Sequence, residues 1–456
     1  MVTLTDLPNE LLGEILLLAT CGDQRQISRA AKWRRNSKFE VGSLALHLLR
    51  HPYHRPLVRT LDFFTLSTLN LLERNPNDAS RANLRPETLA ELAEAAERTI
   101  PDFANSSNWA YCIRKGCTDA IAMLILAWAT QVTEVEFDLP GYAENDSVHN
   151  SNRMMQFIDW AAHNISTRGN RDLPLAKVQH LKVGISHSRH DTELPMSVFH
   201  LPRLRRLTAS GLRINSRDVS IPEHGFAIET LRLEDSKIIG NGLWDIIGAC
   251  KELLVLCVFL NERAPMVASK RAISNAILRQ AGSLKELHLD FETWHVNWLD
   301  EPQVVSSHEE IPLHRCFQYL EKLEGLTVDV EDLRSSPEEQ IMPDFFGPRL
   351  PLSLRTLSIH WKTEEGFPAE FFFLQGEFDV YLDVVNALKA LLAEVGAGYR
   401  THLRYFYHWG ILEASDELDE VEEFMKKNGV VVKEYPFEDS DYDIPFNWYD
   451  WYTNRD

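Results

Sequence analysis

The chain has 456 residues and carries 67 acidic against 47 basic side chains, which gives a formal net charge of −20. Because 44% of its residues are hydrophobic and 25% are charged, the composition is that of a folded protein and excludes a chain that is disordered throughout. The surplus of negative charge opposes binding to nucleic acid over the molecule as a whole, so no nucleic-acid partner is expected.

No membrane-spanning helix is expected, because the longest apolar stretch, residues 120–129, is about half the roughly 20 residues that a bilayer requires. The first residues are acidic, with Asp6, Glu10 and Glu14 ahead of the first basic residue, Arg25. A secretory signal begins with basic residues, so this order favours an intracellular protein of the cytoplasm or nucleus. The six cysteines contain no C-x-x-C spacing, as expected in a reducing compartment.

Residues 4–20 predict a short N-terminal helix that opens at Pro8, where the missing N–H costs nothing. Its apolar side chains fall into two overlapping stripes, so the hydrophobic arc is wider than a single buried face requires. One stripe can serve a local core and the other a foreign helix. Further helices are predicted over 24–35 and 43–51, the latter stopped by Pro52. Together these segments predict a small helical module over residues 1–52.

An L-x-x-L-x-L phrase then recurs along the chain. Its spacing predicts a short strand that lends alternate residues to a core, with the preceding apolar residue packed under the turn. Successive copies lie 24 to 39 residues apart. The first intervals fall inside the window of about 20 to 29 residues for leucine-rich repeats, and the later intervals are longer. Seven copies begin at Val178, Leu204, Ile228, Leu253, Leu284, Leu323 and Leu354, and weaker copies begin at Val58 and Val132.

Between the phrases, apolar residues recur with a period near 3.6 in 89–96, 154–161, 243–247 and 272–277, which predicts helices. Strand followed by helix, repeated, predicts an α/β fold. The expected architecture is a curved, irregular leucine-rich-repeat solenoid over residues 53–375, with parallel strands on its concave side.

The C-terminal part changes character. Helices are predicted over 381–395 and 417–427 and strands over 403–409 and 430–432, which favours capping repeats over residues 376–435. Residues 436–456 form an acidic tail rich in aromatic side chains. Residues 413–456 carry a net charge of −10 and residues 1–60 a net charge of +4. This polarity favours protein partners engaged at separate ends.

The common phosphate-binding, dinucleotide-binding, hydrolase and metalloprotease motifs are absent, so no enzymatic activity, cofactor or metal is expected. His47 and His51 lie four apart with His54 nearby, a spacing that two zinc ligands on a helix can share, but surface histidines are favoured because no fourth ligand follows. Cys112 and Cys117 have no second pair at zinc-finger spacing, which favours core thiols.

The N-terminal helix carries a more specific pattern. Leu7-Pro8-x-Glu10-Leu11-Leu12-x-x-Ile15-Leu16 resembles the opening of an F-box, and Leu46-x-Leu48-Leu49-Arg50-x-Pro52, followed by Leu57-Val58-Arg59-x-Leu61, is similar to the passage after the F-box in many fungal F-box proteins with leucine-rich repeats. The phrase Cys250-x-x-Leu253-x-x-Leu256 also looks like the repeats of that family. The second half of the F-box departs from the family, because Arg29-Ala30-Ala31-Lys32-Trp33 stands where a Val-Cys-Arg-x-Trp style ending is usual.

The resemblance implies a substrate receptor of a Skp-cullin-F-box ubiquitin ligase, with a Skp-type adaptor and a cullin as partners and no catalysis by the chain itself. The residues that it assigns to adaptor binding are Leu7, Pro8, Glu10, Leu11, Leu12, Ile15 and Leu16. The repeat surface would hold a target protein and raise the effective concentration of its lysines at the loaded ubiquitin-conjugating enzyme.

Target contacts are expected from outward positions of the repeat strands, which alternate with the core positions. The candidates are Lys182, Thr208, Arg232, Glu234, His288, Asp290, Thr327, Asp329, Ser358 and His360. Two alternatives stay open: a non-catalytic interaction scaffold whose N-terminal helices act only as a cap, and an enzyme with an unrecognised site.

Overall fold

The architecture comes from a computed structural model of the whole chain. It describes residues 41–63, 84–140, 153–169, 172–186, 192–215, 225–234, 236–239, 242–260, 270–291, 311–335, 340–360, 378–400, 402–409 and 423–434.

The described residues build one open sheet of eleven parallel strands, whose spatial order follows the order of the chain. Each strand pairs with the strand that follows it, and a separate pair of short strands, β5 (Arg213–Asn215) and β7 (Lys237–Ile239), lies beside it. The strands of the main sheet are β1 (Thr60–Phe63), β2 (Glu134–Pro140), β3 (His180–Ser186), β4 (Arg206–Ser210), β6 (Thr230–Glu234), β8 (Val255–Leu260), β9 (Glu286–Phe291), β10 (Gly325–Asp329), β11 (Thr356–His360), β12 (Tyr405–Trp409) and β13 (Val431–Glu434).

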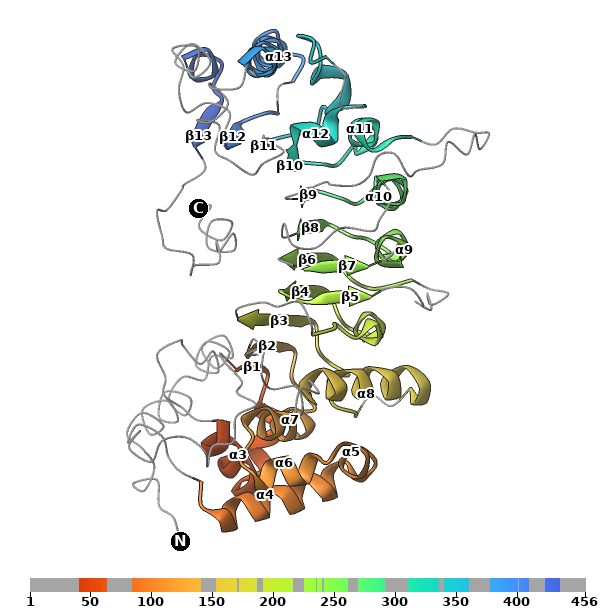
Figure 1. Cartoon of the computed structure of the whole chain (residues 1–456), viewed down its shortest axis with the longest axis vertical. Helices are drawn as coiled ribbons and strands as arrows, with labels where there is room; N and C mark the ends of the chain where they lie inside the picture. The colour runs from red at the N-terminus through yellow and green to blue at the C-terminus, as the bar shows by residue number, and fades with distance from the viewer. Residues whose placement is uncertain are drawn as a thin grey trace.

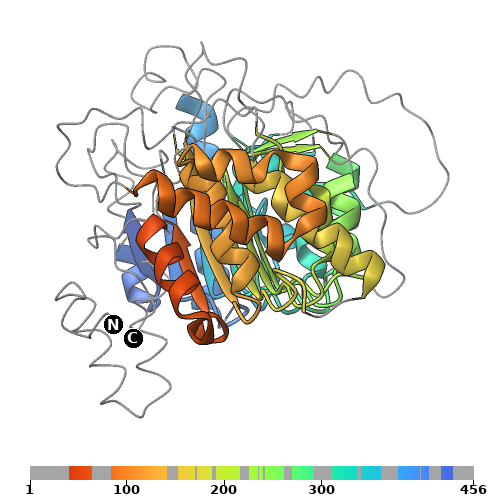
Figure 2. The same ribbon diagram turned by 90° about the horizontal axis from the view of Figure 1, so that it is seen from below.

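A group of helices lies across the N-terminal end of the sheet, where Figure 2 shows them from below. Its centre is helix α7, which is buried from Asp119 to Trp128 and contacts α3, α6 and α8. The members are α3 (Val41–Arg50), the 3-10 turn η2 (Pro52–Leu57), α4 (Pro86–Thr99), α5 (Pro101–Ser107), α6 (Trp109–Arg114) and α7 (Thr118–Trp128).

The connecting helices of the middle of the chain lie on one side of the sheet, and the strands follow an arc that opens away from them (Figure 1). The strands therefore have one face covered by helices and one face turned to the other side. The helical elements are α8 (Arg153–Arg168), η3 (Met196–His200), α9 (Gly242–Ala249), α10 (Lys270–Arg279), α11 (Leu313–Cys316), η4 (Phe317–Tyr319), α12 (Val330–Leu333), η5 (Gly347–Arg349) and, at the C-terminal end, α13 (Phe378–Gly396).

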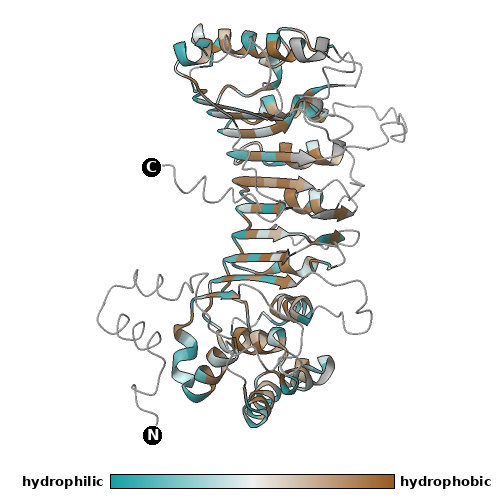
Figure 3. Cartoon of the chain, turned by 60° about the vertical axis from the view of Figure 1, so that its left-hand side comes forward, coloured by the Kyte–Doolittle hydropathy of each residue, from teal (hydrophilic) through white to brown (hydrophobic). Residues whose placement is uncertain are grey.

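One apolar row holds the sheet together. The second leucine of each phrase pairs in register with its neighbour, as Leu231 does with Leu207 and Leu256, and each is fully buried. At about 25 cal/mol per Å² of apolar surface removed from water, such a row is a dominant source of stability. Figure 3 shows hydrophobic and hydrophilic residues interleaved along the strands. The row is Leu61, Val135, Leu181, Leu207, Leu231, Leu256, Leu287, Leu326, Leu357 and Phe406.

A backbone pattern repeats at the entrance of the strands. Leu254 and Val255 both donate their N–H groups to the carbonyl of Glu229, at 2.8 and 3.0 Å. The next strand does the same, since Lys285 and Glu286 both donate to the carbonyl of Leu254. The pattern extends from the β1–β2 pair to the β11–β12 pair, so neighbouring strands share one local geometry.

Two polar side chains hydrogen bond to backbone groups of the preceding repeat. The Gln280 amide donates to the carbonyls of Ile247 and Cys250, both at 2.9 Å, and its oxygen accepts the N–H of Leu253 at 3.2 Å. Arg400 does the same near the C-terminal end, with its guanidinium donating to the carbonyl of Pro351 at 3.1 Å. These bonds satisfy backbone groups that burial would otherwise leave without partners.

The prediction of an α/β fold with parallel strands is confirmed, because every one of the seven phrases and both weaker copies ends in a strand of the sheet. The predicted C-terminal strands are confirmed as well, as β12 and β13 extend the same sheet. The helices over 89–96, 154–161, 243–247, 272–277 and 381–395 correspond to α4, α8, α9, α10 and α13. The helices predicted over 4–20 and 24–35 fall outside the described residues. Within the described ranges, no helix combines the length and apolar character that crossing a bilayer requires.

The apolar row yields a paired stability test on adjacent residues of β4. Leu207 lies fully buried in the row, whereas Thr208 lies half-buried on the opposite face. We expect Leu207→Ala to lower the free energy of unfolding by about 2–5 kcal/mol, since a cavity replaces packed methyl groups. Thr208→Ala is expected to change it by less than about 0.5 kcal/mol. Urea denaturation followed by circular dichroism measures both, and equal effects would contradict the assignment of faces.

Candidate binding surface on the sheet

The face of the sheet opposite the helices carries the side chains that alternate with the core positions. On strands β1 to β6 these side chains are exposed or half-buried, and we call this part of the sheet the open face. Because the register is continuous, they form two parallel rows across five strands. One row is Thr60, Glu134, His180, Arg206 and Thr230, and the other is Asp62, Glu136, Lys182, Thr208 and Arg232.

Glu134 links three strands of the open face. Its carboxylate accepts a hydrogen bond from Thr60 Oγ1 at 3.3 Å, and its other oxygen lies 3.6 Å from His180 Nδ1. In the second row, the Lys182 ammonium pairs with the Glu136 carboxylate. The acidic groups of β2 are therefore held next to the cationic groups of β3 by fixed cross-strand pairs.

Lys182 is the positive centre of this surface. Partial burial acts to lower the pKa of its ammonium, but the hydrogen bond to Glu136 and the nearby carboxylates of Asp138 and Glu234 outweigh this, so the pKa is raised. Lys182 therefore remains charged throughout the physiological range. Its surroundings combine charges of both signs, which suits a polypeptide with a complementary charge pattern.

His180 responds in the opposite direction. Partial burial and the positive charge of Arg206 lower the pKa of its imidazole, although Glu134 and Glu229 act against them. At neutral pH the ring is therefore neutral, and Arg206 supplies the cation at this point of the row. The open face thus carries acidic side chains on β1 and β2, the cations Lys182, Arg206 and Arg232 on β3, β4 and β6, and a further acidic group, Glu234, at the end of β6.

The outward positions on strands β8 to β11 differ, because most of their side chains are buried, with Val255, Phe259 and Glu286 half-buried. Cys257 is 3% exposed, and burial raises the pKa of its thiol to about 12. The Nδ1 atom of His288 hydrogen bonds to Oγ1 of Thr327 at 2.7 Å, and Ser358 is 3% exposed. This half of the surface therefore offers a partner fewer accessible polar groups than the open face does.

The structure places the predicted target-binding residues on the expected side of the sheet but splits them by exposure. Lys182 is exposed and Thr208, Arg232 and Glu234 are half-buried, so these four line the open face. The predicted contacts of the second half are buried and offer little surface to a partner: His288, Thr327, Asp329 and Ser358. Asp290 and His360 lie on β9 and β11, but their side chains are not among those that the structure describes. The predicted adaptor-binding residues, from Leu7 to Leu16, also lie outside the described residues.

Sequence reasoning missed several residues of the open face. Glu134, Glu136, His180 and Arg206 were not among the expected contacts, although they occupy the same rows. The weaker phrase that begins at Val132 carries the signal for the first two, because its alternation already assigns them to the outward side.

The three N-terminal histidines do come together, at the end of α3 and in η2. His47 Nε2 lies 2.8 Å from His54 Nδ1, and the rings of His47 and His51 are 4.8 Å apart. Burial lowers the pKa of His47 to about 4, with the neighbouring charges of His51 and His54 adding to the effect. No three histidine, cysteine or acidic side chains in the described part of the chain are arranged to hold a metal ion.

Comparison with known proteins leaves this surface to be interpreted on its own geometry: no protein-family model matches the chain, and no curated protein matches its sequence.

The histidine cluster predicts a pH dependence of stability. The imidazole of His47 takes up a proton near pH 6.5 when the chain is unfolded but only near pH 4 when it is folded. Because the unfolded state binds more protons in this window, stability falls as the pH is lowered from 6.5 towards 4. We expect the melting temperature to fall less steeply between pH 7 and 5 in His47→Gln than in the natural protein, as measured by scanning fluorimetry. Identical slopes would show that His47 does not contribute.

Proposed function

We propose that this chain is the substrate-recognition subunit of a Skp-cullin-F-box ubiquitin ligase. The residues from Leu7 to Leu16 bind a Skp-type adaptor, which connects to the cullin, and the open face binds the target protein. The observation that carries the proposal is the combination of an F-box-like start with a long sheet on one face of which the described residues place no helix.

An irregular leucine-rich-repeat solenoid is the repeat class that best fits the described architecture. Each phrase supplies one strand, the strands pair in chain order, and the same backbone pattern recurs at each entrance. Such units cannot bury their apolar face alone, and stacking them gives a continuous core. The uneven intervals between phrases make this solenoid irregular.

The side chains of the open face support a role in protein recognition. Lys182 and Arg206 are exposed, Arg232 is half-buried, and acidic groups from β2 and β6 surround them. Paired charges of both signs contribute more to specificity and orientation than to affinity, which suits a receptor that must release its target after modification.

The chain itself then makes and breaks no bond and needs no cofactor. Its contribution is proximity, since holding a target beside the loaded ubiquitin-conjugating enzyme raises the effective concentration of the target's lysines. The working compartment is the cytoplasm, the nucleus or both.

The alternative is a non-catalytic interaction scaffold in which the N-terminal helices only cap the repeats. The departure at Arg29-Ala30-Ala31-Lys32-Trp33 from the usual second half of an F-box favours this alternative. The two functions share the open face and differ only in whether the first helix binds an adaptor.

Adaptor binding separates them. We expect the full chain to form a complex with a purified Skp-type adaptor and the double variant Leu11→Asp, Leu12→Asp to lose at least about tenfold in affinity, because two buried leucines are typically worth more than 1.4 kcal/mol. Isothermal titration calorimetry measures the loss. Circular dichroism of the variant serves as the folding control. Absence of binding by the natural chain would leave the scaffold function.

A second experiment tests the open face. The measurement is proximity labelling of proteins that accumulate when the proteasome is inhibited. We expect the double variant Lys182→Glu, Arg232→Glu to reduce this labelling by about fivefold or more, because the lost charge pairs cost about 1 kcal/mol or more. The matched control reverses two exposed cations in turns, Arg203→Glu with Lys251→Glu. Equal labelling by both variants would exclude the open face as the target site.

A further inference from the structure

Cys112 and Cys117 meet where helix α6 ends and α7 begins. Gly116, with φ of 74°, adopts the left-handed conformation that closes a helix, and its N–H donates to the carbonyl of Ile113 at 2.8 Å. The N–H of Cys117 donates to the carbonyl of Cys112 at 3.0 Å. This pair of bonds is the Schellman motif, in which the residues at the two ends of the longer bond bring their side chains into contact.

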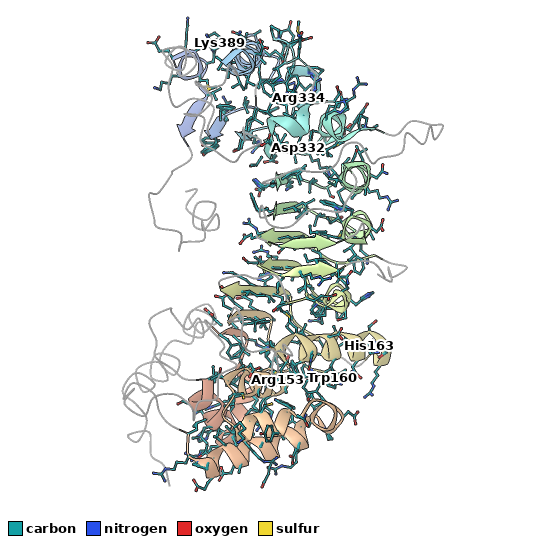
Figure 4. The ribbon with its side chains drawn as sticks, in the orientation of Figure 1. Arg153, Trp160, His163, Asp332, Arg334 and Lys389 are labelled. Carbon is teal, nitrogen blue, oxygen red and sulfur yellow. The ribbon has the colours of Figure 1, made fainter. Side chains whose placement is uncertain are left out.

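The Schellman turn brings the two thiols together. The interaction with Cys117 lowers the pKa of Cys112 against the opposing effect of burial. Arg153 is the first residue of α8 (Figure 4), and its positive charge lowers the pKa of Cys112 further. The interaction with Cys112 and burial together raise the pKa of Cys117.

A buried ion pair holds Arg153 beside the thiols. Its guanidinium donates to Oδ2 of Asp119 at 3.2 Å, and Oδ1 of the same carboxylate accepts the N–H of Ala120 at 2.8 Å. The Asp119 side chain is 2% exposed and that of Arg153 14%. If the guanidinium moved away, the negative charge of Asp119 would stay buried without a cation beside it, which is costly.

The other cysteines of the described residues lack this arrangement. Cys250 donates its thiol to the carbonyl of Ile246 at 3.3 Å, and burial raises the pKa of Cys250 and of Cys257 to about 12. Burial also raises the pKa of Cys316. Among the described cysteines, the pair is thus the place where a thiol has both a second thiol and a cation beside it.

We propose that Cys112 and Cys117 form a dithiol site that a peroxide oxidises to an intramolecular disulfide. A disulfide requires the two Cα atoms to lie within about 4.4–6.8 Å, and the short turn that the Schellman motif closes holds the two residues side by side. The proposal does not depend on the adaptor or on the target.

The reaction balances with hydrogen peroxide as the oxidant. The Cys112 thiolate attacks one peroxide oxygen, the O–O bond breaks, and the released hydroxide takes the proton that Cys112 lost, giving a sulfenic acid and water. The Cys117 sulfur then attacks the sulfenic sulfur, the S–O bond breaks, and the departing hydroxide leaves as water with the Cys117 proton. Two thiols lose two electrons, and peroxide becomes two molecules of water.

The position of the pair determines what the disulfide does. Cys112 and Cys117 are 5% and 7% exposed, so a sulfenic acid formed on Cys112 is shielded from solvent and meets Cys117 first. The disulfide links the end of α6 to the start of α7, and α7 in turn contacts α3 and α8. Oxidation therefore stiffens the connection between α6 and α7 within this helical group.

The test treats the purified full chain with hydrogen peroxide at low molar excess, blocks remaining thiols with iodoacetamide under denaturing conditions and maps the peptides by mass spectrometry. We expect a Cys112–Cys117 disulfide to form first and to be reversed by dithiothreitol, while Cys250, Cys257 and Cys316 remain alkylated. In Cys117→Ser we expect Cys112 to oxidise at least about tenfold more slowly, with its sulfenic acid trapped by dimedone. Cys250→Ser is the matched control and should behave as the natural chain.

Two results would overturn the proposal. One is that Cys112 and Cys117 stay reduced while Cys250, Cys257 or Cys316 oxidise. The other is that oxidised Cys112 pairs with any cysteine other than Cys117. Because peptide mapping of the natural chain distinguishes both results from the expected one, the test holds even where a variant fails to fold.

Discussion

The structure depends on a row of apolar side chains that runs in register through the parallel sheet. From Leu61 to Phe406, each strand contributes one buried residue that packs against the equivalent residue of the next strand. The row explains why strand order follows chain order, since each unit can bury its leucines only against its immediate neighbours. It also explains the character of the open face: the same alternation that sends leucines inward places charged and hydroxyl groups on the outward side of strands β1 to β6.

This row also explains which features of the fold could be predicted from the sequence. The L-x-x-L-x-L spacing predicts each strand and its direction, because orientation within a strand is local. Exposure is not local: His288 and Lys182 occupy equivalent positions in the phrase, yet one is buried and the other exposed. Helix α7 was missed because its residues 120–128 are apolar on all sides and show no helical periodicity. Helices α5 and α6 have only seven and six residues, too few to show a period.

The pair of Cys112 and Cys117 is a second feature that local sequence patterns predict only in part. The spacing of Cys112 and Cys117 matches no metal motif and favours core thiols, which their burial fits. Gly116 is the local signal for their contact, since a glycine that ends a short helix brings residues five apart together. The part played by Arg153 comes from another helix, 34 residues beyond Asp119, and no local pattern indicates it.

We propose a division of labour in which residues 4–20 engage an adaptor and the open face binds another protein. Hydrogen–deuterium exchange of the full chain with and without a purified Skp-type adaptor distinguishes the two roles. We expect new protection in peptides covering residues 4–20 and unchanged exchange in strands β3 to β6. Protection of those strands, or no protection of the N-terminal peptides, would refute this division.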